Sequence, residues 1–86
     1  MLYPYMTLND DTEITHSETL PDGKVKVVIE TPVEGGFHSA VCYLPGYQWT
    51  EIKGYSEMEM MYLRSLISKN AALILEFAAK GGFANA

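Results

Sequence analysis

Several features that would identify a function are scarce or missing in this sequence. It has a single cysteine, Cys42, so no disulfide framework can link its segments. No apolar run approaches the ~18 residues that a membrane-spanning helix needs. The N-terminal residues also lack the basic and apolar regions of a secretory signal. We therefore expect a cytoplasmic protein without a membrane segment.

Catalytic motifs are absent as well. The sequence contains no Gly-rich phosphate loop, no paired-carboxylate signature and no cysteine–histidine motif. Ser17 follows His16 directly, and in a strand these two side chains would point to opposite faces. We expect no catalytic residues, no cofactor and no enzymatic activity.

Soft metal ligands are limited to His16, His38 and Cys42. His38 and Cys42 are four positions apart, which in a strand places them on one face but roughly 13 Å from each other. That separation is too large for one ion, although a helix would bring them together. Because the surrounding residues alternate as in a strand, no metal site is expected.

Positive charge is also scarce, since the net charge of the 86 residues is −5. From the first basic residue, Lys24, onward, six acidic residues balance six basic ones, so the excess lies in the first 23 residues. An acidic surface repels a phosphate backbone, and direct nucleic-acid binding is not expected. It serves solubility or attracts a basic protein partner. The acidic residues concerned are Asp10, Asp11, Glu13, Glu18 and Asp22.

One long helix is clearly encoded from Ser56 to Gly82. Ser56 and Glu59 have the spacing of a capping box, and Lys80 followed by two glycines supplies the stop. About 24 residues without Gly or Pro lie between these signals, or roughly 36 Å of helix. The rest of the fold must be built around this element.

Strand patterns precede the helix. Period-two alternation predicts strands over Leu2–Leu8, Lys24–Thr31 and Phe37–Leu44, with a Thr-rich segment at Thr12–Leu20, reversals at Pro21–Gly23 and Pro32–Gly36, and a possible short strand at Tyr47–Ile52. Pro4 assigns the first strand to an edge of the sheet. We therefore expect residues 1–86 to form a single α+β domain: an antiparallel meander of three to four strands, followed by one long C-terminal helix packed on one sheet face.

An apolar stripe on the helix should face the sheet. Asn70 lies within this stripe and needs a hydrogen bond to the sheet, to water or to its own copy in another chain, unless it sits at a wet edge. The stripe consists of Leu63, Ile67, Asn70, Ile74 and Phe77, with Leu66 and Leu73 beside it.

Apolar side chains remain after one helix has covered one sheet face, and such a surplus is typical of an interface. They are Tyr3, Tyr5, Val28 and one set from Phe37–Leu44. A separate cluster at the start of the helix, Met58, Met60, Met61 and Tyr62, serves either a partner or the core. The leading expectation is a non-enzymatic homodimer. A second is a small ligand-binding module, with a pocket lined by Trp49, Tyr47 and His38. The candidate partner-binding residues are Tyr3, Tyr5, Val28, Tyr43, Tyr47, Trp49 and Asn70.

A few short motifs resemble the partial ribonuclease-like domain of HicB-type antitoxins. These are the opening Tyr3-Pro4, the Leu44-Pro45-Gly46 turn that closes a strand, and the capped helix after Gly54. The Pro21–Gly23 hairpin departs from the pattern, and the DNA-binding segment common in that family is absent. The resemblance implies an antitoxin-like or inhibitor protein that masks a basic partner.

Overall fold

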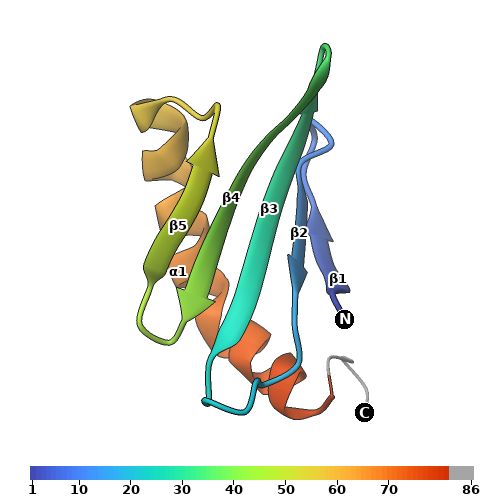
Figure 1. The fold of residues 1–86 in the computed structure, drawn as a ribbon, viewed down its shortest axis with the longest axis vertical. Helices are drawn as coiled ribbons and strands as arrows, with labels where there is room; N and C mark the ends of the chain where they lie inside the picture. The colour runs from blue at the N-terminus through green and yellow to red at the C-terminus, as the bar shows by residue number, and fades with distance from the viewer. Residues whose placement is uncertain (82–86) are drawn as a thin grey trace.

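The computed structural model describes residues 1–81 and has the expected α+β architecture (Figure 1). Five strands form one antiparallel sheet in the order β1-β2-β3-β4-β5, and one helix follows them. The possible strand at Tyr47–Ile52 is confirmed as β5, which makes the strand count one higher than expected. The elements are β1 (Tyr3–Thr7), β2 (Glu13–His16), β3 (Val25–Val33), β4 (Gly36–Leu44), β5 (Gln48–Lys53) and α1 (Glu57–Ala79).

The long β3–β4 hairpin forms the centre of the sheet, with pairs from Val25–Leu44 to Val33–Gly36. The expected reversal at Pro32–Gly36 is wrong at its start, because Pro32 belongs to β3 and pairs with Phe37. β2 pairs only with Val27–Glu30, so β3 has no neighbour on that side at Pro32. A missing backbone N–H is tolerated there, as on an edge strand.

Strand β1 lies at the sheet edge, as Pro4 predicts, but its strict alternation is wrong. The register shifts between Pro4 and Met6, so that Tyr3 pairs with His16 and Met6 with Ile14. A bulge of this kind inserts one extra residue into the strand. Tyr3 and Met6 therefore pair with two buried residues of the same sheet face, His16 and Ile14, and Tyr5 reaches Asn70 on the helix. The expectation that Tyr3 and Tyr5 stay on the uncovered face is therefore wrong.

The core lies between the sheet and α1. Alternate residues of β3 and β4 point into it, including Val27, Ile29 and Cys42, which are fully buried. Ile67 and Ile74 meet them from the helix, with 0% exposure each. The buried helix residues are Met60, Leu63, Ile67, Ala71, Ile74 and Ala78.

The expected apolar stripe of the helix is thus partly wrong. Ala71 and Ala78 occupy the buried face in place of Asn70 and Phe77, which lie half-buried beside it, while Leu73 is exposed. Small residues allow the helix backbone to approach the sheet closely, whereas larger side chains fit at the flanks of the contact.

Both ends of the helix follow their sequence signals. Ser56 is the N-cap and forms the complete capping box with Glu59. Lys80 is the C-cap, and Gly81 has a φ of 83°, a conformation that glycine adopts without a steric penalty. Gly82, the last residue of the expected stop, lies outside the described residues. Over residues 1–81, no helix combines the length and apolarity needed to cross a bilayer.

The second face of the sheet is open over the described part of the chain. In Figure 1 the helix lies behind the sheet and no described segment lies in front. Val28, Val41 and Tyr43 form the apolar centre of this open face, where Val41 is only 8% exposed because its neighbours cover it. Pro32 and Phe37, which is 64% exposed, continue this face toward the β3–β4 turn. The other surrounding positions are polar: Glu13, Thr15, Lys26, Glu30, Ser39, Gln48, Thr50 and Lys53. The open face is therefore mixed, and not apolar throughout.

Candidate binding cleft

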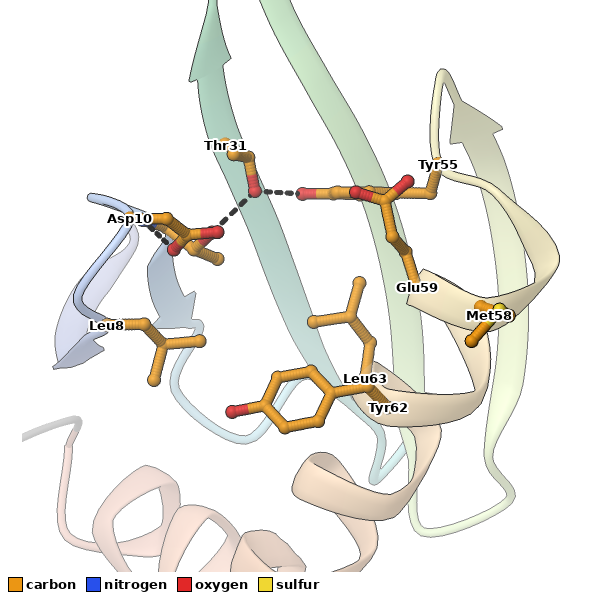
Figure 2. Close-up of a pocket in the computed structure, with 9 residues that line it drawn as sticks. Leu8, Asp10, Thr31, Tyr55, Met58, Glu59, Tyr62 and Leu63 are labelled. Carbon is orange, nitrogen blue, oxygen red and sulfur yellow. Dashed lines mark hydrogen bonds between the residues drawn. The ribbon is translucent and has the colours of Figure 1, made fainter.

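A cleft of about 270 Å³ opens between the β1–β2 turn and the N-terminal turns of α1 (Figure 2). Its walls come from three separate segments of the chain: the β1–β2 turn, β3, and residues 55–63 at the start of α1. The lining residues are Leu8, Asp10, Thr12, Thr31, Tyr55, Met58, Glu59, Tyr62 and Leu63.

The β1–β2 turn fixes the first carboxylate of the cleft. The Leu8 amide donates to the Thr12 carbonyl at 2.8 Å and closes the turn. Asp11 adopts a φ of 66°, which aspartate tolerates better than most residues. The Thr12 amide donates to Asp10 Oδ1 at 3.1 Å. Hydrogen bonds from the Thr12 side chain and backbone hold the pKa of the Asp10 carboxyl below its usual range.

The helix cap fixes the second carboxylate. The Ser56 amide donates to Glu59 Oε1 at 2.8 Å, and the Glu59 amide donates to Ser56 Oγ at 3.1 Å. Hydrogen bonds from the Ser56 backbone and side chain hold the pKa of Glu59 below its usual range. Asp10 and Glu59 are therefore both ionised at neutral pH.

Three hydroxyl groups connect the two sides of the cleft. Thr12 Oγ1 lies 2.6 Å from Thr31 Oγ1, which lies 2.8 Å from the Tyr55 hydroxyl (Figure 2). Thr12 is only 2% exposed, so its polar group depends on these partners. Burial raises the pKa of the Tyr55 hydroxyl, which remains protonated. The row ties the turn, β3 and the start of the helix together.

Apolar side chains complete the cleft. Leu63 is 4% exposed and lies at its base, whereas Met58 and Tyr62 are 81% and 58% exposed. Leu8, in the β1–β2 turn, lies opposite Leu63 and Tyr62 (Figure 2). The cleft thus combines an apolar wall with two ionised carboxylates, a lining suited to an amphipathic, positively charged group.

Asn70 finds its hydrogen bonds within the chain. The Tyr5 hydroxyl donates to Asn70 Oδ1 at 2.6 Å, and Asn70 Nδ2 donates to the Leu66 carbonyl at 2.8 Å. Of the alternatives left open by the sequence, the bond to the sheet is the one formed. Tyr5 also packs against Phe77, with ring centroids 6.0 Å apart. Tyr5 and Asn70 therefore join β1 to α1.

The other candidate partner-binding residues are scattered. Tyr3 lies beside His16, with ring centroids 6.0 Å apart, and Val28 and Tyr43 share the open sheet face. Tyr47 is 45% exposed in the β4–β5 turn, while Trp49 packs against the core. The expected pocket residues Tyr47, Trp49 and His38 contribute nothing to the lining of the cleft.

The acidic residues of the N-terminal segment lie at two ends of the sheet. Asp10, Asp11 and Glu13 are in or next to the β1–β2 turn, whereas Glu18 and Asp22 belong to the β2–β3 connection at the opposite end (Figure 1). Only Asp10 lines the cleft. The second carboxylate of the cleft, Glu59, lies after Lys24, in the part of the sequence where acidic and basic residues are equal in number.

Cys42, His16 and His38 are each held by packing or hydrogen bonds within the fold. Burial raises the pKa of the Cys42 thiol to about 11, so it is protonated at neutral pH. His16 Nδ1 lies 2.8 Å from the Ser17 carbonyl oxygen in the core, and the His38 ring packs edge-on against Tyr55. In the described part of the chain, no three histidine, cysteine or carboxylate side chains gather as metal ligands would.

Most of the cleft was missed by sequence reasoning. Capping and turn signals locate Glu59 and Asp10 separately. Only the tertiary fold, which places the β1–β2 turn beside the start of α1, brings them into one cleft. Thr12, Thr31 and Tyr55 carry no local signal, because a row of hydroxyls from distant segments has no sequence spacing. No protein-family model, curated protein or solved structure matches this chain.

Proposed function

We propose that this is a non-enzymatic cytoplasmic protein that acts through protein–protein contact, as a homodimer formed by the outer face of α1. The observation that carries this proposal is the concentration of exposed apolar side chains on the helix. Met58, Met61, Tyr62 and Leu73 are between 47% and 81% exposed. Apolar groups gathered on one element favour burial against another molecule.

A seam along the outer helix face suits a second copy. Its positions alternate in steps of three and four, which is the spacing by which two helices pair. Small residues in its middle permit close approach of the two backbones, and methionines at one end adapt to an irregular surface. The seam consists of Met58, Met61, Ser65, Ser68, Ala72, Leu75 and Ala79, of which Leu75 is half-buried and also packs against the core. Tyr62 and Leu73 lie outside the seam, on the neighbouring exposed side of the helix.

The open sheet face is the competing surface for dimerisation. Val28 and Tyr43 give it an apolar centre, but charged residues surround them. Charged groups are depleted at the centre of stable interfaces, and here they lie within one or two positions of it. The helix seam is therefore the better dimer surface.

Two single substitutions distinguish these surfaces. Ala72→Glu places a charge in the middle of the helix seam, and Thr50→Glu places one opposite Val41 on the open sheet face. Both positions are exposed, so the monomer fold should tolerate both changes. In sedimentation equilibrium at micromolar concentration, we expect a dimer for the original chain and for Thr50→Glu, and a monomer for Ala72→Glu.

Other results of this experiment count against the proposal. A monomeric original chain would remove the homodimer, and a dimer broken only by Thr50→Glu would move the interface to the sheet. Circular dichroism of each variant checks that the helix content is retained.

A second function is the masking of a basic partner, as an antitoxin-like or inhibitor protein does. The cleft between Asp10 and Glu59 favours it, because both carboxylates are ionised and stand beside exposed apolar side chains. Association with a partner carrying several positive charges should weaken as salt is added. Affinity that is independent of ionic strength would argue against this function.

A further inference from the structure

Three hydroxyl groups stand in a row at the back of the cleft. Thr12 Oγ1 lies 2.6 Å from Thr31 Oγ1, which lies 2.8 Å from the Tyr55 hydroxyl oxygen. In each contact either oxygen can be the donor. Each hydroxyl oxygen has two lone pairs, so the row can also accept from a donor that enters the cleft.

The ionised Asp10 and Glu59 carboxylates are acceptors only, and a carboxylate has room for several donors on its two oxygens. The lining contains no lysine, arginine or histidine, and the Thr12 amide already donates to Asp10. The two ionised carboxylates of the cleft are therefore acceptors with no cationic side chain in the lining to pair with them.

We propose that this cleft binds the guanidinium group of an arginine side chain carried by a basic protein partner. The proposal rests on the second function above and names the residue of the partner that enters the cleft. Asp10 and Glu59 would accept from the guanidinium nitrogens, and the Tyr55 oxygen would accept at the back. Hydrogen bonds between a guanidinium and a carboxylate are charge-assisted and roughly twice as strong as neutral ones.

The apolar wall fits the remainder of the same side chain. Arginine carries three methylene groups that pack on apolar surface while its head remains polar, and Leu8 and Leu63 offer that surface. Tyr62, which is 58% exposed, presents an aromatic ring on which a planar guanidinium can stack. A volume of about 270 Å³ lies just below the range typical of drug-sized ligands, which suits a single side chain.

Arginine fits better than the other charged groups. Its five donors lie in a planar fork and match several acceptors at once, whereas lysine offers a compact point charge. An anion would meet two ionised carboxylates and find no cationic side chain in the lining. The positive end of the helix dipole lies near this site, but Glu57 and Glu59 in the first turn offset it.

Binding can be measured with a small probe. The probe is the tripeptide acetyl-Leu-Arg-Leu-amide, and its control is the same peptide with citrulline, which has nearly the same shape and no charge. In ¹H–¹⁵N NMR titrations at low salt, we expect the arginine peptide to shift amide signals of residues 8–12 and 55–63. The citrulline peptide should bind at least about tenfold more weakly, because it loses both charge-assisted pairs.

Matched variants test the carboxylates. Glu59→Gln retains a side chain suited to the capping box, and Asp10→Asn retains the oxygen that accepts from the Thr12 amide. Each should weaken binding of the arginine peptide by about three- to tenfold. Glu57→Gln, an exposed carboxylate in the same helix turn but outside the lining, is the control and should change affinity less than twofold.

Four outcomes would overturn the inference: equal binding of both peptides, equal loss in Glu57→Gln and Glu59→Gln, no shift at millimolar arginine peptide, or shifts confined to residues outside the cleft. The last of these would leave the masking of a basic partner standing, since the peptide would then bind at another acidic surface.

Discussion

Two polar side chains that are buried or half-buried, Thr12 and Asn70, each form hydrogen bonds with specific partners. Thr12 depends on Thr31, and Asn70 on Tyr5 and the Leu66 carbonyl. An unpaired buried polar group costs about 1–3 kcal/mol, so each of these contacts selects one arrangement of the segments it joins. In both cases the contact joins segments far apart in the sequence.

Removal of the central hydroxyl should therefore destabilise the protein. Thr31→Val conserves shape but deprives both Thr12 and Tyr55 of a partner, and we expect a loss of about 1–3 kcal/mol in the free energy of unfolding. Urea denaturation measures it. Thr15→Val is the matched control, because Thr15 Oγ1 makes only a 3.5 Å contact with the Val28 carbonyl and should lose less than about 0.5 kcal/mol. Equal losses for the two variants would contradict the role given to Thr31.

Among the elements, α1 was the most predictable, because its signals are local. The capping box at Ser56 and Glu59 and the apolar positions Leu63, Ile67 and Ile74 are all confirmed. The sequence could not reveal that Ala71 and Ala78 face the sheet, because alanine is common on either side of a helix. Which of two neighbouring stripes is buried depends on how closely the helix approaches the strands.

Strands were predictable in type and less so in register. The alternation of Val25, Val27 and Ile29 fixes the inner face of β3, and the structure confirms it. The bulge near Pro4 carries no comparable signal, since it depends on the pairing with β2. The cleft shares this difficulty, because its lining comes from contacts among distant segments.

A neighbouring pair on α1 tests its orientation. Ile74 is fully buried and Leu73 is 47% exposed. Ile74→Ala should cost about 2–5 kcal/mol, enough to unfold much of so small a domain, whereas Leu73→Ala should cost less than about 1 kcal/mol. Chemical denaturation measures both losses in the free energy of unfolding, at a protein concentration low enough for the chain to be monomeric. Similar costs at the two positions would mean that the helix presents a different face to the sheet.

Considered as one molecule, the protein concentrates carboxylates at the end of the sheet that holds the cleft. Asp10, Asp11 and Glu59 lie there, and Glu13 stands directly opposite Glu30 on adjacent strands. Like charges in directly opposed positions destabilise a sheet. The molecule thus tolerates a repulsive arrangement at the end where we place recognition of a positively charged partner.

Reversing one of these charges should stabilise the free protein. Glu13→Lys converts the pair with Glu30 into an attractive one, and we expect a gain of about 0.2–1 kcal/mol in the free energy of unfolding at low salt. Glu13→Gln removes only the repulsion and should gain less. Urea denaturation at ~10 mM and ~1 M salt separates the contributions, because screening shortens the reach of surface charges and should remove most of the gain. A Glu13→Lys variant that is no more stable than the original at low salt would show that the carboxylates at this end do not repel one another appreciably. The acidic end would then need no recognition role to explain it.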